Sequence, residues 1–463
     1  MEKKILGNES ERKNVSEETL QQYVTKLKKM LNCRTVFLRD QSNKGEFDKF
    51  YQVINDNFPH VVKRAERLEF GTGCFIYHIA GKNAKHNIML MSHHDVVAGT
   101  DGWNSNPFEA LEKEGHLYAR GSIDTKTPLF AELQACEELL EENWPFEGLN
   151  VYIGSSNNEE VCGDGMVLAA KYFKEKGIRF DAILDEGGAI TSGMIPGYDG
   201  KSAMVAVHEK SRHMYRCTVD LNTKGHGGLN PSEDSAILRL SQFIDKVSRS
   251  KIYKSHFYSE VEATFRTHAP YMKFPLNIAF GHLHLFSPLI KKIMMGIPQA
   301  RAMLSTSISF TSFFAGTKED PQIKAKKAEC TMFLRCIREE DLEEGLAKLK
   351  EIASEYGVEI SLMERDYCPP SSFDSYPFHT LEKVMESNFP DVLTAPFLLT
   401  AGTDARRFGE VADSILRFAP IDLSSEQFAS VHGDNENIGI QNIGQCVCFY
   451  KDYLKAYQEG IKK

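Results

Sequence analysis

Between residues 70 and 190 the sequence alternates short apolar runs with helical patterns, and this alternation restricts the possible fold more than any other feature. It is typical of an α/β layer with a largely buried sheet. Ligands of such sheets gather beyond the carboxyl ends of the strands. The predicted strands are Phe75–Ala80, Ile88–Met91, Val151–Gly154 and Ala182–Leu184, and the predicted helices are Phe130–Glu142 and Gly165–Lys176.

After about residue 206 the pattern becomes that of a second, smaller domain. At 463 residues the chain is too long for one compact core. Apart from a helical insert at about 251–300, residues 207–366 follow the order β-α-β-β-α-β of a ferredoxin-like domain. We therefore expect a catalytic domain in two parts, 1–206 and 367–463, with residues 207–366 inserted as a lid.

Two helix starts are predicted from capping signals. Asn14, followed three residues later by Glu17, has the spacing of a capping box ahead of a helix at Leu20. The segment Asn230-Pro231 with Glu233 predicts the start of the first lid helix, which we expect to run to about Val247.

Composition excludes several classes of partner. With 55 Lys+Arg against 64 Asp+Glu, the net charge of −9 argues against nucleic acid. The first 15 residues lack the apolar stretch of a secretory signal, and charged or histidine side chains interrupt the apolar segment Leu276–Ile297, so no membrane partner is expected. Ten cysteines without paired spacing favour reduced thiols and a cytoplasmic location.

Candidate metal ligands follow the predicted strands. Glu159 and Glu160 stand just past an apolar strand, a costly place for two adjacent carboxylates unless something there uses negative charge. The other residues of this kind are His93, Asp95, Asp124, Asp185 and His432. Together they offer enough oxygen and imidazole ligands for two metal ions, with one carboxylate left over to act as a base.

Taken alone, each of these candidate residues also has a purely structural interpretation. An adjacent pair of glutamates is usually a solvated helix face, and a single His-x-Asp is usually a surface or packed histidine. We interpret His94 as structural, because an alternating strand end points it away from its neighbours. Cys162 is interpreted as a small buried residue, since harder ligands are already available.

The motifs resemble those of the co-catalytic zinc exopeptidase and amidohydrolase family, which includes carboxypeptidase S, glutamate carboxypeptidase, aminoacylase, acetylornithine deacetylase and succinyl-diaminopimelate desuccinylase. The carboxypeptidase S branch is the most similar. The resemblance implies an α/β, zinc-exopeptidase-type catalytic domain, with a mixed, largely parallel sheet and an inserted ferredoxin-like lid that dimerises. The matching segments are Ser92–Val97, Arg120–Lys126, Asn158–Glu160, Asp185–Gly188, Gly225–Gly228, Thr403–Arg406 and Val431–Gly433.

The resemblance also implies a role for each site residue. His93, Asp124 and Asp185 would bind one zinc ion, and Asp124 would bridge to a second, held by Glu160 and His432. Asp95 would hydrogen-bond the other ring nitrogen of His93. Glu159 would be the general base. His226, delivered from a dimer partner, would stabilise the oxyanion, and Arg406 would bind a substrate carboxylate.

The expected activity is hydrolysis of a peptide bond beside a free carboxylate, as in a carboxypeptidase or dipeptidase. An N-acyl-amino-acid deacylase is the alternative, and a non-catalytic ligand sensor is a remote one. A two-metal phosphoesterase lacks an obvious phosphate cradle. Zinc could be replaced by cobalt or manganese, since these ligands tolerate all three. The stretch Gly316–Ala328 does not align cleanly with the family, which leaves the substrate class open.

Overall fold

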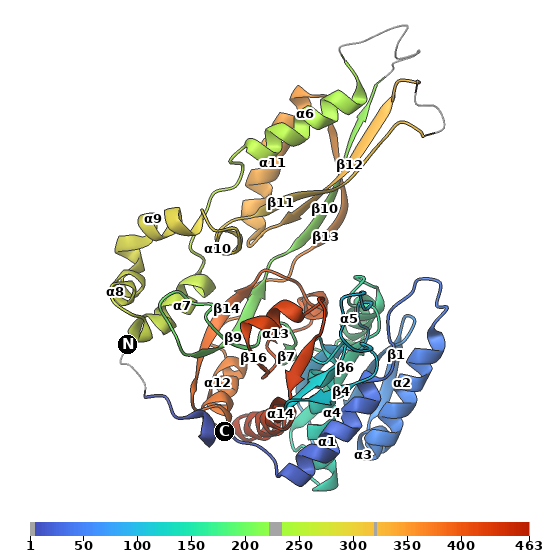
Figure 1. The fold of residues 1–463 in the computed structure, drawn as a ribbon, viewed down its shortest axis with the longest axis vertical. Coiled ribbons are helices and arrows are strands. Elements are labelled where there is room, and N and C mark those ends of the chain that lie inside the picture. Colours follow the sequence, from blue (N-terminus) through green and yellow to red (C-terminus); the bar gives the residue numbers. More distant parts are fainter. Residues whose placement is uncertain (1–4, 222–233, 319–321, 463) are drawn as a thin grey trace.

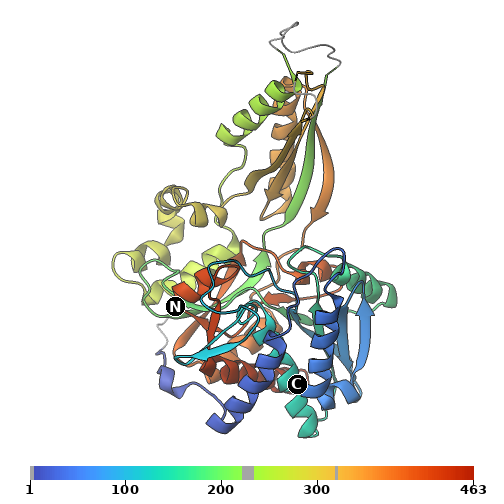
Figure 2. The same ribbon diagram turned by 45° about the vertical axis from the view of Figure 1, so that its right-hand side comes forward.

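The computed structural model describes residues 5–221, 234–318 and 322–462. Figures 1 and 2 show a broad α/β domain and an elongated lid joined to it, with a group of short helices beside the junction. The α/β domain, which we call the catalytic domain after the expectation from the sequence, contains both the first and the last described helices, so the elongated part, which we call the lid, is an insertion in it.

A ten-stranded mixed sheet forms the centre of the catalytic domain. Its order is β1-β2-β6-β3-β7-β15-β9-β8-β16, with β14 also paired to β9. The pairs β6-β3, β3-β7 and β7-β15 are parallel, so the middle of the sheet is parallel as expected. The strands are β1 (Glu66–Phe70), β2 (Cys74–Ile79), β3 (His86–His93), β6 (Leu149–Ser156), β7 (Ala182–Asp185), β8 (Ile190–Ser192), β9 (Lys201–Glu209), β14 (Val392–Leu399), β15 (Ile415–Arg417) and β16 (Asp422–Leu423).

Helices cover both faces of this sheet. One face packs in the largest hydrophobic core, against α1 (Glu17–Leu31), α4 (Lys126–Glu141), α12 (Tyr376–Asn388) and α14 (Ile440–Gly460). The other face packs against α5 (Gly165–Lys176) and η3 (Asp404–Phe408). Smaller elements are η1 (Glu9–Glu11), α2 (Lys44–Asn57), α3 (Pro59–Arg64), α13 (Ser425–Ser430) and a three-stranded sheet of β4 (Leu111–Lys113), β5 (His116–Tyr118) and β17 (Asn437–Gly439).

The lid has the predicted β-α-β-β-α-β order. Its antiparallel sheet is β11-β12-β10-β13, and its core also contains the apolar side of α6 and α11. Tyr215, Cys217 and Val219 on β10 face this core, whereas Arg216 between them is exposed, which is the alternation read from the sequence. The elements are β10 (Arg212–Asp220), α6 (Ala236–Arg249), β11 (Ser307–Ala315), β12 (Lys327–Arg335), α11 (Glu339–Glu355) and β13 (Glu359–Asp366).

The helical insert, which we had assigned to the lid, packs against the catalytic domain. Its apolar side shares a core with Met204 of β9 and Leu393 and Leu398 of β14. Glu260 of α7 is buried between His208 of β9 and Arg338 of the lid, with contacts of 2.9 and 2.8 Å. The insert consists of α7 (Ser259–His268), η2 (Ala269–Tyr271), α8 (Leu276–Gly281), α9 (Leu283–Met294) and α10 (Pro298–Ala302).

One of the two predicted helix starts is wrong. The N-cap of α1 is Ser16, whose hydroxyl accepts the Thr19 N–H at 3.2 Å, and not Asn14. The segment from Asn230 to Glu233 lies outside the described residues, and α6 begins at Ala236 with Ser235 as its N-cap.

Among the described residues, no helix is both long and apolar enough to cross a membrane.

Candidate active site

Three neighbouring parallel strands bring the predicted site residues to one edge of the sheet. His93 ends β3 and lies level with Ser156 of β6, which leads directly to Glu159 and Glu160. Asp124 lies just before α4, and His432 lies in the loop between α13 and β17. Segments that are far apart in the sequence therefore meet at the carboxyl ends of the strands.

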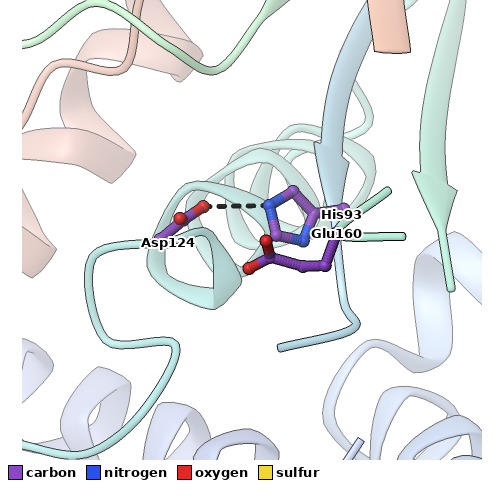
Figure 3. A group of neighbouring side chains, drawn as sticks. All are labelled: His93, Asp124 and Glu160. Carbon is purple, nitrogen blue, oxygen red and sulfur yellow. Dashed lines mark hydrogen bonds and ion pairs between the residues drawn. The ribbon is translucent and has the colours of Figure 1, made fainter. Parts of the chain in front are cut away.

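His93, Asp124 and Glu160 form a cluster whose ligand atoms all lie within 4.8 Å of one another (Figure 3). Asp124 is shared between two histidines: its Oδ1 lies 2.9 Å from His93 Nε2, and its Oδ2 lies 3.0 Å from His432 Nε2. His432 Nε2 also lies 3.0 Å from Glu160 Oε2. Two imidazoles and two carboxylates in this arrangement fit divalent metal ions of the zinc, cobalt and manganese type.

Charge pairing within the cluster favours the ionised form of Asp124. Burial alone would raise the pKa of Asp124, but hydrogen bonds from His432 and His93 outweigh it, so the pKa is lowered. The same bonds from Asp124 and Glu160 raise the pKa of His432 to about 10. Asp124 is therefore held as a carboxylate, the form in which it can bind a cation.

Asp95 holds two parts of the site together, in a different way from the one expected. The Nδ1 of His93 contacts the backbone carbonyl of Asp95 at 2.9 Å, while the nearest carboxylate oxygen is 3.4 Å away. The carboxylate instead accepts the backbone N–H groups of Glu159 and Glu160, both at 3.1 Å. One buried residue thus orients a metal-ligand candidate and fixes the turn that carries the glutamate pair.

The environment of Glu159 suits a group that accepts a proton. Burial raises the pKa of Glu159 well above its usual range, and the nearby carboxylate of Asp404 raises it further, while His93 opposes the change. A carboxylate with a raised pKa is a stronger base than a free one.

Asp185 and its neighbour Glu186 are two adjacent carboxylates at the end of β7. The carboxylate of Asp185 accepts the backbone N–H groups of Glu186 and Ala405, both at 2.9 Å. Burial raises the pKa of Glu186 well above its usual range, and the charges of Asp185, Asp124, His93 and Glu159 act on it. Glu186, to which the sequence analysis gave no role, is therefore close enough to these charged groups to be a further candidate for the site.

Arg406 is buried and bound within the protein. Its Nε donates to Asp366, its Nη1 donates to the Thr403 carbonyl at 2.7 Å, and Glu209 lies 3.8 Å away. Arg335 at the end of β12 lies close to the same group: its Nη1 donates to the Thr400 carbonyl, and its buried Nε has no hydrogen-bond partner among the described residues. Arg335 therefore has a free donor at the junction of the lid and the catalytic domain.

Three further residues complete the comparison with the sequence. His226 lies outside the described residues, so its position is not given by the structure. His94 is buried and stacks on Phe50 and Phe75, which confirms its structural role. Cys162 is exposed, so the interpretation as a buried residue was wrong. It lies in the tight turn that follows the glutamate pair, with a positive φ of 53°.

Glu436 is a site residue that the sequence analysis missed. It is fully buried, and its two oxygens accept the backbone N–H groups of Gly121, Ile123 and Asp124 as well as the side chain of Arg120. These bonds fix the loop that carries Asp124. Its only sequence signal is an acidic residue four positions after His432, which is too weak to identify it alone.

Replacing Glu436 with glutamine is expected to weaken metal binding by about 10- to 100-fold, since residues that orient a ligand contribute this much to affinity. The amide keeps the size of the side chain but has only one oxygen to accept the loop N–H groups. Metal affinity is measured by competition with a chromophoric chelator. Glu426→Gln on exposed α13 is the matched control and should leave affinity unchanged. Equal affinities for both variants would contradict the role of Glu436.

Comparison with known proteins agrees with this geometry. The profile of "Peptidase family M20/M25/M40" matches residues 89–456. Human N-fatty-acyl-amino acid synthase/hydrolase PM20D1 is 30% identical over 426 residues, covering 90% of this chain and 84% of the relative. Probable carboxypeptidase S-like 1 of Dictyostelium discoideum is 27% identical over 446 residues, covering 93% of this chain and 86% of the relative.

Solved structures share the fold over nearly the whole chain. The M20 family metallo-carboxypeptidase of Sulfolobus solfataricus superimposes with a TM-score of 0.67 at 17% identity, covering 96% of this chain and 100% of that one. A dinuclear metal-binding M20 peptidase of Bacillus subtilis gives a TM-score of 0.56 at 11% identity, covering 95% of this chain and 98% of that one. The expected fold class is confirmed.

Proposed function

The chain belongs to peptidase family M20/M25/M40, and on that premise we propose that it hydrolyses the amide bond of a residue that carries a free carboxylate, using two divalent metal ions. It is a hydrolase of this metallopeptidase family. The observation that carries the proposal is Asp124, whose two oxygens each contact a different histidine. A carboxylate in this position is suited to bridge two ions.

In the proposed mechanism a bound metal pair supplies Lewis-acid polarisation of the scissile carbonyl and lowers the pKa of a water. Glu159 takes the proton of the attacking water and passes it to the leaving nitrogen. Asp95 keeps the Glu159 carboxylate in place by accepting its backbone N–H. His93 presents Nε2 to the cluster because its Nδ1 faces the Asp95 carbonyl.

Zinc is the proposed ion, with cobalt or manganese as functional substitutes. Glu160 and His432 would complete one site around Asp124, and His93 would belong to the other. For the third ligand of the second site we favour Glu186 over the sequence-based choice, Asp185, because the Asp185 oxygens already accept two backbone N–H groups.

Arg335 is proposed to bind the substrate carboxylate, in preference to Arg406. A carboxylate is bound best by a guanidinium with unused N–H donors. Arg335 donates from Nη1 to the Thr400 carbonyl but its Nε has no partner among the described residues, whereas Arg406 uses both Nε and Nη1, on Asp366 and Thr403. Arg406 would then act by supporting the junction around Asp366.

Deacylation of N-acyl amino acids is the second candidate. It is supported by the relatives named as N-fatty-acyl-amino acid synthase/hydrolases, one of them 30% identical to this chain. A C-terminal peptide bond and an N-acyl amino acid share the same core, an acyl group on the amine of a residue with a free carboxylate. The cluster itself would serve either substrate.

We also propose a homodimer formed through the lid, and a cytoplasmic location. The strand β11 is an unpaired edge of the lid sheet, with Phe313 and Phe314 exposed on it, which supports pairing with a second copy. In such a dimer His226 would be supplied to the partner's site.

The ten cysteines are all free thiols, which supports the proposed location in a reducing compartment.

The test compares four substrates that share one leucine: a dipeptide, N-acetyl-leucine, a long-chain N-acyl-leucine and the dipeptide with its carboxylate amidated. Metal-reconstituted enzyme is expected to cleave at least one of the first three and to lose about 100-fold or more in kcat/KM on the amidated one. Cleavage only of the N-acyl leucines would establish the deacylase. Equal cleavage of the free and amidated dipeptides would overturn carboxylate recognition, and no cleavage of any would overturn the proposed activity.

A further inference from the structure

The helical insert has an apolar surface that nothing in the described structure covers. On α9, Leu285, Leu289 and Ile293 are 66%, 59% and 59% exposed. Their spacing of four residues places them on one side of the helix, and Phe286 widens the same stripe. The opposite side of α9 is buried through Leu283, Ile290 and Met294, so this helix is apolar on two sides. Figure 1 shows α8 and α9 standing out from the side of the molecule.

Other large apolar side chains of the insert are exposed as well. Phe274 just before α8 is 78% exposed, and Ile278 and Ile297 are about half exposed. Monomeric soluble proteins rarely leave side chains of this size uncovered in one region, so such a patch marks a surface that binds something apolar.

The charge of the region identifies what would cover it. Between Glu262 and Glu319 the sequence contains no Asp or Glu, although the whole chain has 64 of them and a net charge of −9. The cations of this stretch are Arg266, Lys273, Lys291, Lys292, Arg301 and Lys318. Arg266 pairs with Glu262 and Lys273 pairs with Asp199, whereas Lys292 and Arg301 are exposed and form no ion pair within the described part of the chain. An apolar stripe with adjoining unpaired cations complements an anionic lipid surface.

We propose that the helical insert docks the protein on the surface of an anionic lipid membrane. The stripe of Leu285, Leu289 and Ile293 would lie among the acyl chains, with Lys292 at the level of the headgroups. Helix α9 has 12 residues, a length of about 18 Å, so it lies along the surface instead of crossing it. This revises the sequence-based expectation of no membrane partner and does not depend on which amide is cleaved.

Because the insert packs on β9 and β14, docking would hold the catalytic domain at the membrane. His268 of α7 contacts Ser202 of β9 at 2.7 Å, and Thr264 donates to the Pro396 carbonyl of β14 at 2.6 Å. These buried contacts make the insert a fixed part of the catalytic domain, so the lid is not needed for attachment.

The test is co-sedimentation of the full-length, metal-loaded protein with vesicles, either of phosphatidylcholine alone or of two parts phosphatidylcholine to one part phosphatidylglycerol. We expect binding to the anionic vesicles and much weaker binding to the neutral ones. The double variant Leu289→Glu, Ile293→Glu should bind the anionic vesicles about tenfold less or weaker. Lys292→Glu should reduce binding to them on the order of fivefold or more.

Ile237→Glu with Leu238→Glu is the matched control, because it adds the same charges at exposed apolar positions of the lid helix α6. It should bind like the wild type, and both double variants should keep full turnover of a short soluble substrate. Failure of the wild type to bind either vesicle would overturn the proposal, as would an equal loss in the control. A wild-type oligomer that dissociates only in the Leu289, Ile293 variant would assign the surface to a second copy of the chain.

Discussion

Replacing Glu159 with glutamine is expected to lower kcat by a factor on the order of 10³, with both metal ions still bound. The amide has almost the same shape but cannot accept a proton from water, so the attacking nucleophile is not formed. The backbone contact from Glu159 N–H to Asp95 does not involve the side chain and is preserved. Steady-state kinetics give kcat, and elemental analysis of the dialysed protein gives the metal content.

Two further variants separate loss of the base from loss of metal. Glu160→Gln should lose both activity and metal, because Glu160 belongs to the cluster with His93 and Asp124. Glu175→Gln lies on the exposed side of α5 and should behave as the wild type. Full activity of the Glu159 variant with two metals bound would show that another group takes the proton.

The adjacent pair Asp185 and Glu186 gives the second large expected effect. Glu186→Gln should weaken the binding of one metal ion by at least about 100-fold and reduce kcat/KM to a similar degree. Asp185→Asn should retain both ions, because the remaining amide oxygen can still accept one of the two backbone N–H groups. Metal titration followed by calorimetry counts the sites in each variant.

The same pair of variants can reverse the assignment. If Asp185→Asn loses one ion while Glu186→Gln keeps both, the ligand set inferred from the sequence is correct, and the local bonds of Asp185 rearrange on metal binding. The two variants differ in position by one residue and each removes one negative charge, so each serves as the other's control.

The strands with a periodic or apolar sequence, and the site residues at strand ends, could be predicted from the sequence. Alternation along β10 and the apolar run of β3 depend only on neighbouring residues, and they gave the lid order and the parallel centre of the large sheet. The edge that gathers His93, Asp124 and Glu160 follows from the parallel arrangement of β3 and β6.

The features that were missed depend on contacts between distant segments, or on a shift of one residue. The choice between Asp185, the ligand inferred from the sequence, and Glu186, the ligand proposed above, depends on where β7 ends, because side chains alternate at a strand end. Ser16 caps α1, although Asn14 offered an equally good local signal. The insert packs on β14, which begins more than a hundred residues after α7 in the chain. No local sequence pattern predicts a contact between segments so far apart.

The two attachments of Asp95 set a limit on how such an enzyme can change. Its carbonyl faces the His93 ring and its carboxylate accepts the backbone N–H groups of Glu159 and Glu160, so in the proposed mechanism one position controls both retention of the metal and placement of the base. A substitution of Asp95 would therefore change the affinity for the ion and the rate of turnover together. Evolution toward a new substrate, or its imitation in the laboratory, is therefore directed to the lid and the junction, where residues can change while these two contacts are inherited unchanged.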